Sequence, residues 1–290
     1  ISGGLVGSEM CIRDRYNNTT GAQNTSVGKG SMENNTTGGD NCAFGFNALQ
    51  GTNTGSGRNN AFGYEALQDI TTGTQNNAIG FQAGANLTTG SYNQIMGSEA
   101  MENGTTAGYS VAIGHDTLRQ SNGDNNVAIG YQALTANTTA SNNVAIGKNA
   151  LVANTTGTRN TAVGTNVLDN LTTGDDNTAI GFEALTQCSG SDNTALGKDC
   201  LYNCTTGGFN TAAGKDSLTS LTDGTENTGH GVSTGLNLTT GTQNTCIGSE
   251  AGHDLTTGSN NLLLGKNAGR SNSPSGTVND ESNIVCLGNN

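Results

Sequence analysis

Three histidines, His115, His230 and His253, are the first residues to consider as carriers of chemistry. Histidine binds zinc when two or more ligands can reach the same ion. These three occupy different positions of the sequence repeat described below, so no two are expected to stack as ligands. Asp254 follows His253, but nothing fixes a nucleophile beside this pair as a catalytic triad requires. We therefore expect isolated histidines and no metal site.

Paired carboxylates are the second candidate, and Asp175-Asp176 is the clearest pair. Calcium-binding β-rolls repeat their ligands in every coil, whereas the acidic pairs of this chain do not recur in register. Two carboxylates can also cleave glycosidic bonds. Such sites generally use aromatic platforms, and aromatic residues make up only 4% of this chain. We expect no enzyme and no cofactor.

The composition excludes several classes of partner. Eleven Lys and Arg stand against 23 Asp and Glu, which gives a net charge of −12 and disfavours nucleic acids and anionic membranes. No apolar run approaches the roughly 18 residues that a membrane span needs. The chain has 45 Gly, no Trp and 32% hydrophobic residues, so any buried layer must be thin.

A repeat of about 17 residues organises most of the chain. We number each repeat from the Gly that ends a short apolar run, which is position 0, and the consensus is N-T-A-I-G-x-x-A-L-x-x-x-T-T-G-x-x. These anchor glycines are Gly28, Gly45, Gly63, Gly80, Gly97, Gly114, Gly130, Gly147, Gly164, Gly181, Gly197, Gly214, Gly231, Gly248, Gly265 and Gly288.

This period predicts an all-β fold, a parallel β-solenoid of about sixteen 17-residue coils. Helical repeats are longer, and Gly, Asn and Thr at this density oppose helix. In each coil we expect "TAIG" to form one strand, "xxAL" a second strand and "NTTG" a turn. The solenoid is predicted over residues 17–268, with a loop insertion and a terminal coil over 269–290. Residues 1–16, with "LVGSEMCIRDR", share no register with the repeat and are interpreted as a non-native or disordered leader.

Two apolar columns are predicted to fill the interior, at positions −1 and +4. Adjacent residues of a strand point to opposite faces, so the small residues at −2 are predicted to face outward and to pack against another chain. Replacing Ile146 by Asp should then cost several kcal/mol. The residues that represent these positions are Ile129 and Ile146 at −1, Leu134 and Leu151 at +4, and Ala128 and Ala145 at −2.

Asn recurs at position −4, as in Asn126, Asn143 and Asn160. Stacked Asn side chains can pass amide hydrogen bonds from coil to coil, so we interpret this column as structural. Glycosylation is the weaker interpretation, because sequons such as Asn137-Thr138-Thr139 arise automatically from the repeat.

Cys188 and Cys204 both fall at +7 of consecutive coils. They are predicted to lie one coil apart, at about 4.8 Å between Cα atoms, which a disulfide tolerates. A bond in an oxidising setting and two stacked free thiols both remain open. Four other cysteines, Cys42, Cys200, Cys246 and Cys286, are expected to be buried in place of Ala.

At these residues the chain resembles a known family. "SVAIG" at 110–114 and "NVAIGYQA" at 126–133 resemble the head repeats of trimeric autotransporter adhesins, and similar repeats occur in tail-fibre shafts of tailed phages. The resemblance covers most of residues 17–268 and implies a left-handed β-roll with three chains side by side. The period here is longer, because the "NTTG" turn widens each coil. "NLLLGKNAG…SNIVCLGNN" resembles the stretch that precedes the chaperone domain of phage fibres.

The expected function is that of an extracellular structural and recognition fibre, on a virion tail or a bacterial surface. It would be a stiff homotrimer that presents a surface to a receptor or glycan, without inserting into a membrane. One alternative is an ice-binding solenoid, since paired Thr recur at +8 and +9, although these positions also fit a turn. The other alternative is a polysaccharide-degrading tailspike.

Overall fold

The computed structural model of the chain describes residues 17–55, 57–274 and 276–288. The leader expected at residues 1–16 lies outside the described residues. The chain divides into two compact units at Ser141 and Asn142. We describe the two units separately, as unit 1 (described from residue 17 to 141) and unit 2 (described from residue 142 to 288).

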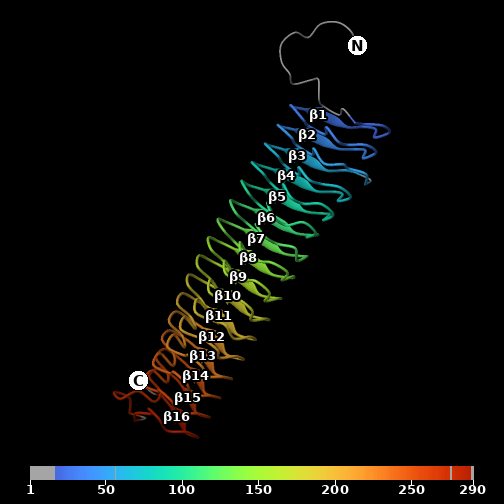
Figure 1. Ribbon diagram of the computed structural model, residues 1–290. Helices are drawn as coiled ribbons and strands as arrows, with labels where there is room; N and C mark the ends of the chain where they lie inside the picture. The colour runs from blue at the N-terminus through green and yellow to red at the C-terminus, as the bar shows by residue number, and fades with distance from the viewer. Residues whose placement is uncertain (1–16, 56, 275, 289–290) are drawn as a thin grey trace. The chain divides into compact units, whose positions relative to one another are not determined.

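Unit 1 is a β-solenoid in which each coil contributes one strand of three residues. Successive strands pair in parallel, in chain order and in register, so that Ala112 pairs with Ala128 (Figure 1). The strands are β1 (Thr25–Val27), β2 (Cys42–Phe44), β3 (Asn60–Phe62), β4 (Asn77–Ile79), β5 (Gln94–Met96), β6 (Val111–Ile113) and β7 (Val127–Ile129).

Unit 2 has the same architecture, and its strands also pair in parallel and in chain order. The strands are β8 (Val144–Ile146), β9 (Thr161–Val163), β10 (Thr178–Ile180), β11 (Thr194–Leu196), β12 (Thr211–Ala213), β13 (Thr228–His230), β14 (Thr245–Ile247), β15 (Leu262–Leu264) and β16 (Val285–Leu287). The described residues contain no helix. The prediction of an all-β parallel solenoid with coils of about 17 residues is confirmed.

Each strand ends at an anchor glycine because the backbone there needs a conformation that other residues avoid. Gly164 has φ of 138°, where an L side chain is strained. A Cβ atom on Gly164 would also lie 2.5 Å from the carbonyl oxygen of Gly181 in the next coil. The repeated Gly is therefore required both by the turn and by the close stacking of coils.

The second strand predicted in each coil does not form. Positions +1 to +6 make a series of turns, although their N–H groups still bond to the adjacent coils: Gln82 N–H donates to Tyr64 O at 2.8 Å and Leu67 N–H to Ala83 O at 3.0 Å. Position +2 and, where Leu occupies it, position +4 have positive φ, 52° at Gln82 and 50° at Leu67. Residues in the left-handed region at +2 and +4 prevent an extended strand.

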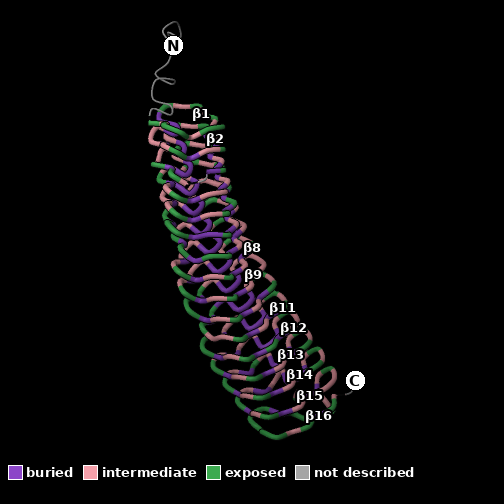
Figure 2. The backbone as a smooth tube through the Cα atoms, turned by 90° about the vertical axis from the view of Figure 1, so that its right-hand side faces the viewer, coloured by how far each residue is buried: buried purple, intermediate pink, exposed green. Residues whose placement is uncertain are grey.

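The predicted orientation of the strand is wrong. Ala128 and Ala145 at −2 are completely buried, whereas Ile146 at −1 is exposed and Ile129 is half-buried. Side chains alternate along a strand, so position −2 shares its side with the Asn at −4, and both point into the coil. Figure 2 shows the buried residues along the interior of the coils and exposed residues on their outer edges.

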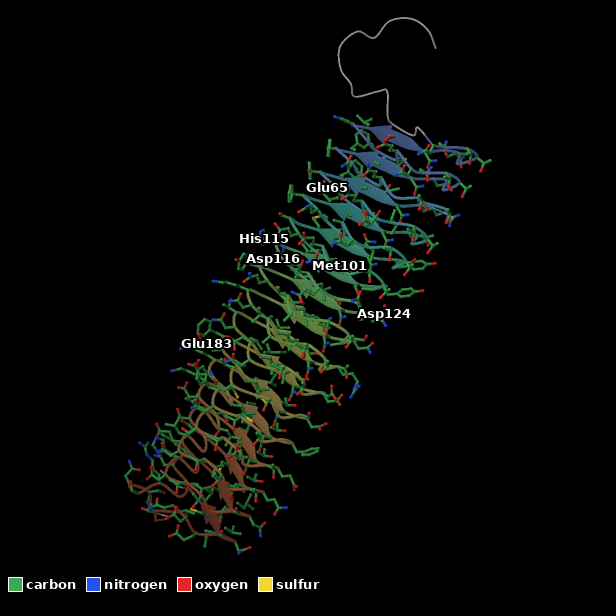
Figure 3. The ribbon with its side chains drawn as sticks, viewed as in Figure 1. Glu65, Met101, His115, Asp116, Asp124 and Glu183 are labelled. Atoms are coloured by element: carbon green, nitrogen blue, oxygen red, sulfur yellow. The ribbon has the colours of Figure 1, made fainter. Side chains whose placement is uncertain are left out.

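The Leu column at +4 is buried as predicted, and Leu134 and Leu151 have no exposed surface. A second interior column stands at +7, with Ile70 and Leu87 in unit 1 and Leu171 and Leu221 in unit 2. Met101, at +4, lies between Glu65 on one side of unit 1 and Asp124 on the other (Figure 3). The core is thus a narrow strip of Leu and Ala inside the coils.

In two of the coils where Gly replaces Leu at +4, a larger residue at −2 of the next coil lies against the glycine. A Cβ on Gly84 would lie 2.9 Å from Cδ1 of Ile95, and one on Gly252 would lie 3.0 Å from Cδ1 of Leu263. The volume lost at +4 is therefore filled by the larger residue at −2, as close packing requires.

Candidate interaction surface

The residues at −1 form an exposed apolar column on the strand face of unit 1. In the strands β1 to β5 each of them is more than a third exposed, and in β6 and β7 they are half-buried. Phe44 and Phe62 stack with ring centroids 5.2 Å apart. The members are Val27, Phe44, Phe62, Ile79, Met96, Ile113 and Ile129.

Unit 2 carries the equivalent column, with large aliphatic residues in most coils. Ile180, Leu196 and Ile247 are each more than 40% exposed. The column consists of Ile146, Val163, Ile180, Leu196, Ala213, His230, Ile247, Leu264 and Leu287. We call the residues at −1 of either unit the −1 column. Monomeric soluble proteins rarely expose contiguous apolar surface of this kind.

A second exposed column stands at +1, just after the anchor glycine, and is aromatic in unit 1. Phe46, Tyr64 and Phe81 form a continuous stack, with centroids 5.2 Å apart and nearly parallel rings. Further along, His115 stacks on Tyr131 at 5.7 Å. In unit 2 this position holds more lysines, and Lys198 Nζ lies 5.7 Å from the ring centroid of Phe182.

Position −3 faces outward beside the −1 column, and in unit 2 it holds a run of threonines. Six consecutive strands, β9 to β14, carry Thr in register: Thr161, Thr178, Thr194, Thr211, Thr228 and Thr245. Five of them are half-buried and Thr211 is exposed. The outer face of these strands is therefore a regular array of hydroxyl and methyl groups.

The Asn column at −4 is structural, as the sequence predicts. Asn160 Nδ2 donates to Gly174 O at 2.8 Å, and its Oδ1 accepts the N–H of Asn177 at 3.0 Å. Asn143 and Asn126 are equally buried and make the same bond to a turn carbonyl, to Gly157 O and Ala140 O. These bonds give hydrogen-bond donors to backbone carbonyls of the turns, which would otherwise be buried without a partner.

Residue variety distinguishes the two strand faces and could have shown which one is buried. Position −1 accepts Phe, Met, Ile, Ala and His, which no close-packed interior would tolerate at equivalent sites. Position −2 is Ala in most coils, and its two largest members, Ile95 and Leu263, lie against glycines at +4. The uniform column, rather than the more hydrophobic one, is the interior.

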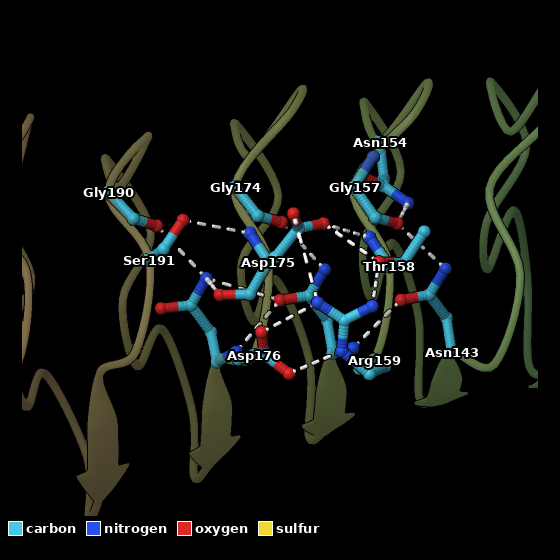
Figure 4. A network of polar contacts seen from close by, with 12 residues as sticks. Asn143, Asn154, Gly157, Thr158, Arg159, Gly174, Asp175, Asp176, Gly190 and Ser191 are labelled. Carbon is cyan, nitrogen blue, oxygen red and sulfur yellow. Dashed lines mark hydrogen bonds and ion pairs between the residues drawn. The ribbon is translucent and has the colours of Figure 1, made fainter.

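The carboxylates of Asp175 and Asp176 are used within the solenoid (Figure 4). Asp176 accepts two hydrogen bonds from the guanidinium of Arg159, at 2.6 and 2.7 Å. Asp175 accepts from the backbone N–H and the hydroxyl of Thr158, at 2.6 and 2.9 Å. Both residues therefore tie one coil to the next.

The carboxylate of Asp254 lies between His253 and Ser271. His253 Nδ1 lies 2.7 Å from Asp254 Oδ1, and Asp254 Oδ2 accepts the N–H of Ser271. Burial opposes the effect, but these hydrogen bonds hold the pKa of Asp254 below its ordinary value. Ser271 thus contacts the carboxylate rather than the imidazole. Within the described residues, no group of three or more His, Cys, Asp or Glu is placed to hold a metal ion.

Cys188 and Cys204 are neighbours, as predicted, in the +7 column of unit 2. Their Sγ atoms lie 3.9 Å apart, both side chains are completely buried, and both thiols are free. Their contact lowers the pKa of Cys188, and the same contact together with burial raises that of Cys204.

Three of the four cysteines that were expected to replace Ala are buried as predicted. Burial raises the pKa values of Cys200 and Cys246 to about 12, and Cys286 is also buried. Cys42 is not: it stands at −3 on the outward face and is half-exposed.

Comparison with protein-family models, with curated proteins and with solved structures finds no match for this chain. In the part of the chain that the structure describes, no helix is long and apolar enough to cross a membrane. The class that the fold defines is the parallel β-solenoid, and its exposed columns are the basis for the functional proposal.

Proposed function

We propose that the chain is a structural and recognition fibre, in which copies associate side by side through the −1 column. The observation that carries this proposal is the exposure of a large apolar residue in most coils along that column. The fibre would be extracellular, on a phage tail or a bacterial surface, where it holds a receptor-binding surface away from the particle.

A second copy of the chain is the partner that best fits the −1 column. The column repeats once per coil, at the strand spacing of about 4.8 Å. A neighbouring copy has the same repeat, so its apolar residues can meet this column coil by coil. The sequence predicted that another chain packs against Ala residues at −2. We now propose that it packs against the −1 column, which includes Phe62 and Ile79. The number of copies, three, follows the resemblance to trimeric adhesin heads.

Sedimentation equilibrium of the full chain tests this proposal. We expect a particle mass of three chains at micromolar concentration. A monomer that stays soluble and folded across the concentration range would contradict side-by-side association.

A second candidate function, ice binding, is favoured by one observation. The six threonines at −3 in β9 to β14 share the strand face with Val163, Ile180 and Leu196. β-Branched side chains have restricted χ1 angles, so this array of hydroxyl and methyl groups is regular enough to order water. In contrast, Thr155 at +8 donates its hydroxyl to Thr172 O of the next coil, which favours a turn role there. Thermal hysteresis should be measured, and it should disappear in Thr194→Lys if this function is correct.

A further inference from the structure

A polar groove runs along unit 1 beside the strand face, across the coils that end at Gly63, Gly80 and Gly97. It has a volume of about 280 Å³ and is lined by side chains at −5 and −3. The lining residues are Arg58, Asn60, Gln75, Asn77, Tyr92 and Gln94.

The backbone of each coil builds this groove. Residues at −5 have positive φ, 60° at Gln75 and 64° at Tyr92, and the Asn at −4 turns into the core. Asn76 and Asn93 at −4 are completely buried. The side chains at −5 and −3 therefore both point outward and form the two sides of a channel along the coils.

One side of the groove is a chain of amides. Asn60 Nδ2 donates to Asn77 Oδ1, and Asn77 Nδ2 donates to Gln94 Oε1 at 2.9 Å. A primary amide has two N–H donors and two acceptor lone pairs, and this chain uses only one of each at Asn77. The remaining donors and acceptors can bond to a ligand that offers both, as a sugar hydroxyl does.

The other side of the groove ends in an aromatic ring. Tyr92 stacks on Tyr109 with centroids 4.8 Å apart and rings 7° from parallel. Tyr109 is not part of the groove, so it covers the face of Tyr92 that is turned away from it. Tyr92 lines the groove beside Gln75, which holds the same −5 position one coil earlier, and Tyr92 is 44% exposed. The exposed part of Tyr92 offers both apolar ring surface and a phenolic hydroxyl to a sugar.

The charge of the groove favours a neutral ligand. Arg58 is its one ionised residue, and Asp40 lies 3.9 Å from the Arg58 guanidinium. The net charge of the chain is −12, which repels polyanions at a distance.

We propose that this groove binds a neutral, β-linked glycan whose chain runs along the coils. One pyranose ring is about as long as the strand spacing of about 4.8 Å, so successive sugars can meet successive coils. The exposed part of Tyr92 contacts a sugar, and the amides of Asn60, Asn77 and Gln94 bond to hydroxyl groups. This inference rests on the proposed recognition function and names the chemistry of the receptor.

An oligosaccharide array with the labelled full chain tests the groove. The probes are hexamers of β-linked glucose, mannose and galactose, with hexagalacturonate as the acidic comparison. We expect retention on at least one neutral hexamer and weaker retention on hexagalacturonate. Tyr92→Ala and Asn77→Ala should each weaken binding at least tenfold while the circular dichroism spectrum is unchanged.

Tyr131→Ala is the matched control, because Tyr131 is exposed to a similar extent in the same unit but lies outside the groove. It should bind as the wild type does. No binding to any neutral hexamer, stronger binding to hexagalacturonate, or an equal loss in Tyr131→Ala would each overturn the glycan proposal. Sedimentation of the same samples separates the two proposals: a trimer that binds no sugar contradicts only the groove, and a monomer that binds contradicts only the assembly.

Discussion

Ala145 and Ile146 are neighbours in β8 and lie on opposite sides of the sheet, with Ala145 completely buried and Ile146 36% exposed. The smaller residue therefore belongs to the core and the larger one to the surface. This arrangement leaves a regular apolar column outside the coil, and that column is what a neighbouring copy would cover.

Core packing predicts that Ala128→Leu destabilises unit 1. The side chain of Ala128 is completely buried, so a larger side chain at this position has to displace its neighbours. Overpacking of this kind costs about 1–3 kcal/mol, which a urea unfolding curve would detect. Ile129→Leu, at the next residue but on the outward side, should leave the unfolding midpoint almost unchanged. Equal effects would mean that the assignment of the two faces is wrong.

The Asn column predicts that Asn160→Ala is destabilising although no apolar contact of note is lost. The substitution leaves Gly174 O and the N–H of Asn177 without their partners, which costs about 1–3 kcal/mol for a buried group. Thermal unfolding would measure this loss. Thr155→Ser keeps the hydroxyl in the turn and serves as the control, with little expected change. A wild-type melting temperature for Asn160→Ala would show that the column is dispensable.

The Arg159–Asp176 pair predicts a pH-dependent effect. Hydrogen bonds from Arg159 hold the pKa of Asp176 below its ordinary value. A carboxylate with a lowered pKa in the folded state stabilises that state above its unfolded pKa of about 3.9, and the stabilisation is lost as the pH falls through the folded value. Asp176→Asn should therefore lower the melting temperature slightly at pH 7 and not at pH 2. A difference that is constant over this range would contradict the ion pair.

The stacked thiols predict one specific disulfide. Refolding the chain with oxidised glutathione should link Cys188 to Cys204, and trypsin cleavage after Lys198 would leave two peptides joined by that bond for mass spectrometry. Closing this loop should stabilise the oxidised chain by about 3 kcal/mol relative to the reduced one. Cys204→Ala should abolish both effects. A dominant link from Cys188 to any other cysteine would show that the coil register is wrong at this point.

The repeat made much of the fold predictable. A fixed period places Leu134 over Leu118 and Cys204 next to Cys188 without any knowledge of coil shape, so the +4 column, the Asn column and the cysteine contact follow from counting. The period does not show which face of the strand is buried. Side chains at −1 and −2 lie on opposite faces whether −1 or −2 points inward. Hydrophobicity then favoured Ile over Ala, and this choice was wrong.

The turns and the groove could not be predicted for a different reason. Leu67 and Tyr92 have positive φ, which is costly for residues with a Cβ atom. The intrinsic preferences of Leu and Tyr therefore do not predict this backbone conformation. The coil imposes these conformations through its inter-coil hydrogen bonds. Unless these backbone conformations are known, the sequence does not show that Tyr92 and Asn77 lie on the two sides of one groove.

The most direct test of the account compares Ile146→Asp with Ala145→Asp by sedimentation and circular dichroism. The expectation that Ile146→Asp costs several kcal/mol no longer holds, because this side chain points outward. We predict that Ile146→Asp keeps the β spectrum but sediments as smaller particles than the wild type, since a charge would enter each contact of the proposed trimer. Ala145→Asp should unfold unit 2, because it buries an unpaired carboxylate. Unfolding by Ile146→Asp, or an unchanged particle mass, would contradict the account.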